Sequence, residues 1–201
     1  LDYNIRALEM LEKLSEKNSI RLCLSNLGHI YKIKGKNDKA LDYYYKTLVL
    51  REQLGDKKGK RLTLNNIGNT YYNKGNYNKT AEYIEKSLVI QNKIEEDQGE
   101  LLLRSTTFLY LAYKNLGKEY DKKEIYSLIK EAENIEFELN YRFYELLEDT
   151  TYLKIAYNQV QEKADNLEPE VATKFLELPI PSAIVEEWDK VKSPTSPILP
   201  S

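Results

Sequence analysis

The chain has 201 residues, of which 41% are hydrophobic and 31% are charged, and its formal net charge is −2. This composition is typical of one water-soluble domain, and the near-neutral charge argues against nucleic-acid binding, which needs a basic surface. One cysteine and one histidine exclude an intramolecular disulfide and the usual Cys/His zinc sites, and no apolar run is long enough to span a membrane.

The segment 22–99 contains one pattern twice, with a period of forty residues. Self-similarity at a fixed period indicates a stacked-repeat protein, in which each unit buries its apolar face against the next. The matching pairs are Leu24 and Leu64, Asn26 and Asn66, Gly28 and Gly68, Tyr31 and Tyr71, Gly35 and Gly75, and Tyr43 and Tyr83.

Residues 1–17 align with the second half of this repeat, since Tyr3 and Leu8 stand forty residues before Tyr43 and Leu48. We therefore predict a second helix whose first helix is missing. This favours a fragment of a longer array, and the alternative is a natural start whose lone helix caps the next repeat.

Each complete repeat is predicted to form two helices. Leu24, Leu27 and Tyr31 recur at three- and four-residue steps and share one helix face, and Gly35 then ends that helix. Ala40 and Tyr44 begin a second apolar stripe, which predicts a helix folded back on the first.

Gly28 and its repeat equivalent Gly68 lie in the middle of a predicted helix, where glycine costs about 1 kcal/mol relative to alanine. The same cost at the same place in both repeats predicts that the second helix crosses the first there at close range. Between the repeats, the glycine- and lysine-rich segment 55–60 reads as an exposed, mobile loop.

The third repeat is altered. Tyr113 and Gly117 follow Tyr71 and Gly75 by 42 residues, and Tyr110 replaces the mid-helix glycine. We expect its two helices to persist with changed packing.

The remaining sequence predicts a helical cap. One long helix is expected over 141–167, and Pro169 suits the first turn of a following helix, which would direct Val171 and Phe175 inward. A short helix around 182–191 would dock Trp188 on the cap, before a proline-rich tail.

These residues resemble a known family. A leucine or isoleucine before glycine, a tyrosine three residues later, a glycine four residues after that, and alanine, an aromatic residue and leucine on the second helix are similar to the tetratricopeptide repeat. The forty-residue period resembles the extended repeats of kinesin light chains and of bacterial signalling proteins. HEAT and armadillo repeats share the longer period but lack this glycine and tyrosine pattern.

The resemblance implies an all-α fold, a right-handed α-solenoid of antiparallel helix pairs with C-terminal capping helices. The expected division is an array over 1–138, capping helices over 141–192 and a flexible tail over 193–201. Within the array we expect a half repeat at 1–17 and repeats at 20–56, 60–97 and 101–137.

The first helices of stacked pairs line the concave side of such an array. Asparagine is unfavourable inside helices, yet it recurs on the first helices here, and its amide can pair with both N–H and C=O of an extended peptide. Asn26 and Asn66 match the asparagine ladder with which repeats of this family, such as those of O-GlcNAc transferase, hold peptide backbones. The candidate partner-binding residues are Asn26, His29, Lys32, Asn65, Asn66, Asn69, Tyr72, Asn73, Arg104 and Phe108.

The sequence therefore predicts a noncatalytic, cytoplasmic protein-interaction module, part of a larger regulator, that binds a protein or peptide in its groove. We expect no catalytic residue, cofactor, metal, nucleic acid or membrane. The alternatives are a self-associating scaffold, and a sensory or regulatory arm of a signalling enzyme whose catalytic domain lies outside this chain.

Overall fold

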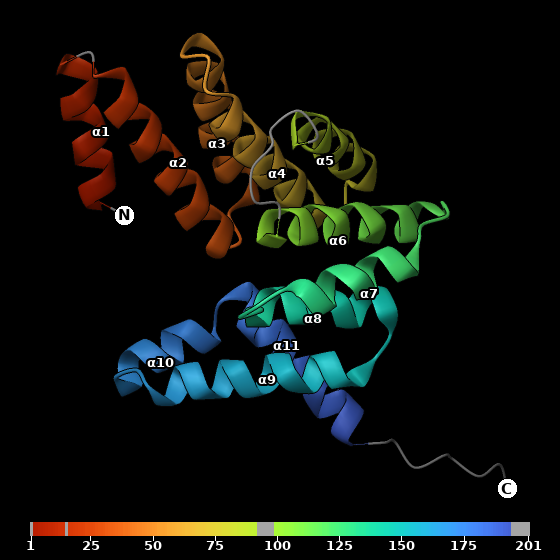
Figure 1. The fold of residues 1–201 in the computed structure, drawn as a ribbon. Helices are drawn as coiled ribbons and strands as arrows, with labels where there is room; N and C mark the ends of the chain where they lie inside the picture. The colour runs from red at the N-terminus through yellow and green to blue at the C-terminus, as the bar shows by residue number, and fades with distance from the viewer. Residues whose placement is uncertain (1, 15, 92–98, 194–201) are drawn as a thin grey trace, which may run out of the picture. The chain divides into compact units, whose positions relative to one another are not determined.

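The computed structural model describes residues 2–14, 16–91 and 99–193. Over these residues the chain forms eleven α-helices and no β-strand (Figure 1). They divide between two compact units, residues 1–133 and 134–201, each of which is described separately. The first unit contains α1 (Asp2–Leu14), α2 (Lys17–Ile33), α3 (Asn37–Gln53), α4 (Lys57–Asn73), α5 (Tyr77–Gln91), α6 (Gly99–Leu116) and α7 (Lys122–Glu131).

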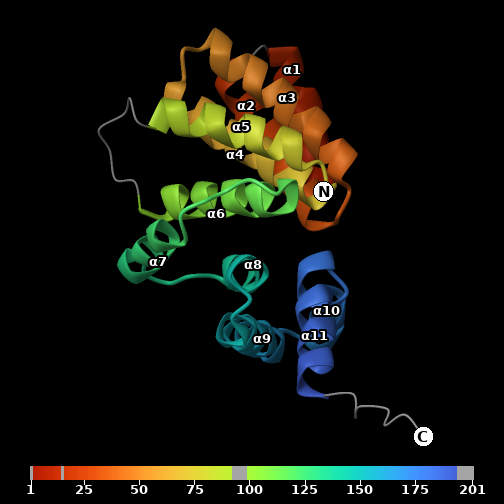
Figure 2. The ribbon, with the colours of Figure 1, turned by 90° about the vertical axis from the view of Figure 1, so that its right-hand side faces the viewer.

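The first unit is a stack of helix pairs. α2 packs on α3 and α4 on α5, while α3 contacts α4 and α5 contacts α6, so that each pair rests on the next (Figures 1 and 2). A glycine with positive φ follows α2, α4 and α6 and lets the chain turn sharply: Gly35 at 68°, Gly75 at 71° and Gly117 at 67°. The predicted all-α fold of stacked helix pairs is confirmed.

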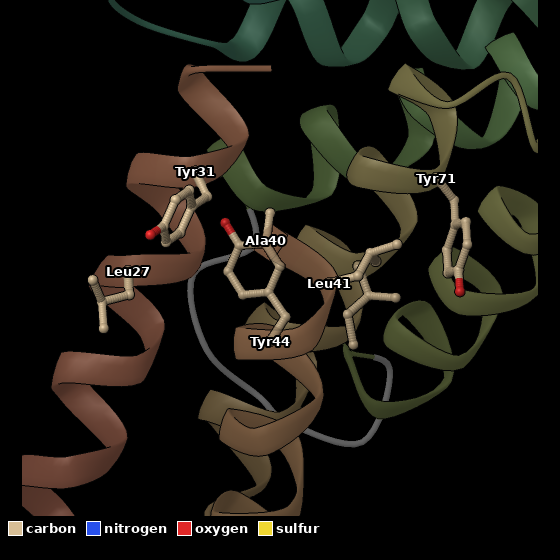
Figure 3. Packing of buried hydrophobic residues seen from close by; sticks show 7 residues of the cluster. Leu27, Tyr31, Ala40, Leu41, Tyr44 and Tyr71 are labelled. Atoms are coloured by element: carbon tan, nitrogen blue, oxygen red, sulfur yellow. The ribbon is translucent and has the colours of Figure 1, made fainter. Parts of the chain in front are cut away.

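The core of the first repeat is built by residues from three helices. Leu27 and Tyr31 come from α2, Ala40 and Tyr44 from α3, and Tyr71 from α4 (Figure 3). Because the next repeat contributes Tyr71 to this cluster, the hydrophobic effect couples the two repeats.

The mid-helix glycines lie where the helices of each pair approach most closely. A Cβ atom at Gly28 would lie 2.6 Å from the Tyr44 ring, and one at Gly68 would lie 2.7 Å from Ile84 Cδ1. Real Cβ atoms essentially never come that close to another heavy atom. The predicted close crossing is confirmed in both repeats.

The segment 55–60 is not the loop that its composition suggests, although Gly55, Lys57 and Lys58 are exposed as expected. α4 already begins at Lys57, and the Asp56 carboxylate caps it by accepting a hydrogen bond from Gly59 N at 2.8 Å. Gly59 is buried, because Arg51 reaches over from α3 and donates to its carbonyl oxygen. Burial lowers the pKa of Arg51, and the Asp56 carboxylate, 3.9 Å from its Nε, partly offsets that effect.

Three tyrosine hydroxyls join the first two repeats. Tyr45 of α3 lies 2.9 Å from the Tyr71 hydroxyl of α4 and donates a 3.0 Å hydrogen bond to the Tyr83 hydroxyl of α5. Burial and these hydrogen bonds raise the pKa of Tyr45 well above its usual range, so the phenol stays protonated. The cluster is therefore a neutral hydrogen-bonded tie between repeats.

The two helices of the third repeat pack differently from those of the first two repeats, as the sequence suggests. Tyr110 stands on α6 in place of the mid-helix glycine and contacts Tyr120 at a ring-centroid distance of 5.3 Å, while its hydroxyl bonds Glu124 of α7. α7 is short and ends at Glu131, because Ala132 is extended and Asn134 takes a left-handed φ of 53°.

The second unit contains α8 (Phe137–Leu147), α9 (Thr150–Asp165), α10 (Pro169–Leu176) and α11 (Pro179–Lys192). The single helix predicted over 141–167 is wrong. Glu148 has a left-handed φ of 62°, and Asp149 caps a new helix by accepting from Thr151 N at 2.9 Å.

The core of the second unit lies between α9 and α11. Leu153, Val160 and Ile184 are fully buried, and the Trp188 ring stacks on Tyr157 at 5.5 Å, which confirms that this tryptophan docks within the cap. Pro169 opens α10 as predicted. Val171 does not point inward as expected, since it is 49% exposed. The tail expected over 193–201 lies outside the described residues except for Ser193.

Replacing Gly28 by alanine tests the close crossing. Alanine favours a helix by about 1 kcal/mol, but overlap with the Tyr44 ring costs about 1–3 kcal/mol, so we expect the free energy of unfolding to fall by up to about 2 kcal/mol. Denaturant unfolding followed by circular dichroism measures this, with Asn78→Ala on the exposed face of α5 as the control. A Gly28→Ala protein more stable than the unaltered chain would contradict the packing described.

Candidate partner-binding face

One face of α2 is open to solvent. Asn26 and His29 are exposed, and Leu22 (52% exposed) and Ile33 (43%) lie above and below them at helical spacing. The opposite face of α2 carries Leu27 and the other residues of the core. Amide and imidazole groups between two exposed apolar side chains can bind the backbone and side chains of another polypeptide.

This face continues onto α4 for a short distance. Leu62 is 42% exposed and Asn66 is half-buried, and both stand forty residues after their counterparts on α2. We define Leu22, Asn26, His29, Ile33, Leu62 and Asn66 as the first-helix face.

Two of the predicted binding asparagines instead serve the packing of the array. Asn65 and Asn69 are each only 1% exposed. The Asn69 amide donates to Asn65 Oδ1 at 3.0 Å, and the Asn65 amide donates to the Ser105 hydroxyl of α6. These side chains hold α4 against α6.

Phe108 on α6 is also a core residue. It is fully buried in a cluster with Ala81 and Ile84 of α5, and the Tyr72 ring packs edge-on against it at 5.4 Å. Tyr72 in turn contacts the Tyr77 ring at 5.6 Å.

The other predicted binding residues are neither as exposed as Asn26 and His29 nor, apart from Lys32, as buried as the core residues. Lys32 is 9% exposed, while Asn73 and Arg104 are half-buried. The structure thus exposes Asn26 and His29 on α2, leaves Asn66 half-buried on α4, and places Asn65, Asn69 and Phe108 inside the array. Which of the ten predicted residues bind a partner stays a prediction.

Sequence reasoning missed the apolar part of this face. Leu22 and Ile33 look like core residues by composition. Leu22 stands four residues before Asn26, however, and Ile33 four residues after His29, so they share the exposed side of the helix. That spacing was the signal that could have identified them.

The described residues also bear on other functions. Among them, no group of three or more His, Cys, Asp or Glu side chains is arranged to hold a metal ion. Within the same ranges, none of the helices combines the length and apolar character that crossing a membrane requires.

Comparison with known proteins supports the resemblance seen in the sequence. The pattern of the tetratricopeptide repeat matches residues 21–54 and 62–97, which correspond to α2–α3 and to α4–α5 with the segment that follows. A search of curated proteins found no match to the chain. Together with the stacked helix pairs and the glycine-mediated crossing in each, the two matches identify α2–α3 and α4–α5 as tetratricopeptide repeats.

Proposed function

We propose that this chain is a noncatalytic protein-interaction module that binds a peptide segment of a partner along the first-helix face. Tetratricopeptide repeats generally mediate protein–protein interaction, and the matched repeats form a stack of helix pairs. The observation that carries the proposal is the exposure of Asn26 and His29 beside Leu22 and Ile33.

The chemistry of this face suits an extended peptide. The amides of Asn26 and Asn66 each offer a donor and an acceptor to a peptide backbone, and each such bond contributes about 0.5–1.5 kcal/mol net. Leu22, Ile33 and Leu62 supply apolar surface for side chains of the partner. Binding energy in such interfaces rests on a few residues, so single anchors on this face should matter.

The test is affinity capture from native lysate with the unaltered chain and with the Asn26→Ala, His29→Ala double variant. Both side chains are exposed, so their loss should leave the fold intact while the amount of the captured partner falls about tenfold, as expected for the loss of about 1.4 kcal/mol. Asn65 and Asn69 are unsuitable for this test, because their loss would disturb the α4–α6 packing.

The matched control is Asp42→Ala, Lys46→Ala on α3, whose side chains are also exposed but lie on a second helix. We expect this variant to capture the same partner at the unaltered level. Equal capture by the first-helix variant and the unaltered chain would refute binding along this face.

A second candidate function, self-association, is favoured by the uncovered face of α1. In both complete repeats a tyrosine of the first helix stacks on a tyrosine of the second, Tyr31 on Tyr43 at 5.5 Å and Tyr71 on Tyr83 at 5.7 Å. Tyr3 is the repeat equivalent of Tyr43, but it is 87% exposed, and Met10 on the same helix is 65% exposed. We propose that another copy of the chain covers this face.

Analytical ultracentrifugation over a range of concentrations tests self-association. The unaltered chain should show a mass that rises with concentration, and Tyr3→Glu, Met10→Glu should remain monomeric, because charged side chains oppose burial of this face. A chain that stays monomeric at high concentration would remove this candidate without affecting the first one.

A further inference from the structure

The turn between the two helices of each repeat carries lysines at one edge of the array. Lys39 follows Gly35, Lys79 follows Gly75 and Lys118 follows Gly117, and all three lysines are exposed. The turns recur at the same end of each helix pair, so these lysines form a row along the stack. We call the five lysines at these turns the lysine edge: Lys36, Lys39, Lys74, Lys79 and Lys118.

Three of these lysines lie over tyrosine rings, one in each repeat. Lys39 Nζ lies 5.5 Å from the centroid of the Tyr31 ring, Lys79 Nζ lies 4.8 Å from that of Tyr71, and Lys118 Nζ lies 5.3 Å from that of Tyr113. Cation–π attraction orients an ammonium group without neutralising its charge. The row therefore presents positioned cations.

Four of the five lysines of the lysine edge form no ion pair with a described acidic residue. In the described part of the chain, Lys36, Lys39, Lys79 and Lys118 make no ion pair, although Lys79 also donates a 3.3 Å hydrogen bond to the Tyr71 hydroxyl. Lys74 does pair, with Asp38. An array with uncompensated, preoriented ammonium groups favours an anionic ligand.

A cavity lies within the lysine edge. It has a volume of about 380 Å³ and is lined by Gly35, Asn37, Asp38 and three lysines, Lys36, Lys39 and Lys74. This cavity can admit a carboxylate side chain. The lysines that line it come from two successive repeats.

We propose that the lysine edge is a second interaction surface, separate from the first-helix face, and that it binds an acidic segment of a protein partner. The carboxylates of that segment would enter the cavity beside Lys39 and pair with Lys79 and Lys118 farther along the stack. This inference does not rest on the peptide-binding function proposed above.

An acidic polypeptide fits this edge better than a nucleic acid does. A nucleic acid carries one phosphate charge at each nucleotide and needs a continuous basic surface, whereas this edge presents one ring-bound lysine in each repeat. One oriented lysine in each repeat matches carboxylates that are spaced apart. Salt should weaken such binding, because all of these charges are exposed.

The experiment uses the whole chain and a fluorescent peptide of alternating glutamate and glycine, long enough to span the three turns, with its glutamine counterpart as the uncharged probe. Fluorescence anisotropy should show binding of the glutamate peptide only, and weaker binding at high salt. The triple variant Lys39→Gln, Lys79→Gln, Lys118→Gln should raise the dissociation constant at least about fivefold.

Two matched variants separate position from charge. The first removes the same charge elsewhere, by Lys57→Gln, Lys58→Gln and Lys154→Gln, and should change the dissociation constant less than about twofold. The second keeps the charge in place, by Lys39→Arg, Lys79→Arg and Lys118→Arg, and should retain binding. The Asn26→Ala, His29→Ala variant should bind the glutamate peptide normally, which distinguishes this surface from the first-helix face.

Several results would overturn the proposal. One is failure of the glutamate peptide to bind, and another is an equal loss in the variant at positions 57, 58 and 154. A single-stranded oligonucleotide that binds more tightly through the same three lysines would instead make the lysine edge a nucleic-acid surface. Circular dichroism of each variant ensures that a loss of binding does not reflect unfolding.

Discussion

The close approach of the two helices in each repeat is the constraint on which the rest of the array depends. Because Gly28 and Gly68 carry no side chain, the Tyr44 ring and the Ile84 side chain can lie directly against the first helix. That contact sets the separation of the helices, and the core between them closes around it. Where Tyr110 takes the glycine's place in the third repeat, the partner helix α7 is shorter, and the Tyr110 hydroxyl bonds Glu124 on it.

Polar ties between repeats then determine which residues remain accessible. The Tyr45 hydroxyl joins α3 to α4 and α5, and the Asn65 side chain joins α4 to Ser105 of α6. Each tie occupies a polar group that is then not available to a partner, since a buried amide must satisfy its hydrogen bonds inside the protein. The first-helix face is therefore most open on α2. In the lysine edge, Lys39, Lys79 and Lys118 stay exposed over tyrosine rings, while Lys74 pairs with Asp38.

The repeat, the turn glycines and the close helix crossing could be predicted from sequence. The forty-residue period repeats both the apolar positions of each helix and the glycines that interrupt or end it. The burial of Asn65 could not be predicted, since Asn65 and Asn66 are neighbours in sequence and only the position of α6 decides which one it covers. The end of α8 was missed because Glu148 adopts the left-handed conformation without the usual glycine, although Asp149 followed by two threonines is a recognisable helix start.

Site-specific photo-crosslinking tests the central claim, that partners bind along the layer of first helices, most directly. A photoreactive phenylalanine would replace His29 on α2 in one protein and Val49, which is 51% exposed on α3, in the other. The account predicts that, in native lysate, a discrete crosslinked partner forms from position 29 and not from position 49. Crosslinking of the same partner from position 49 alone, or equally from both positions, would contradict it.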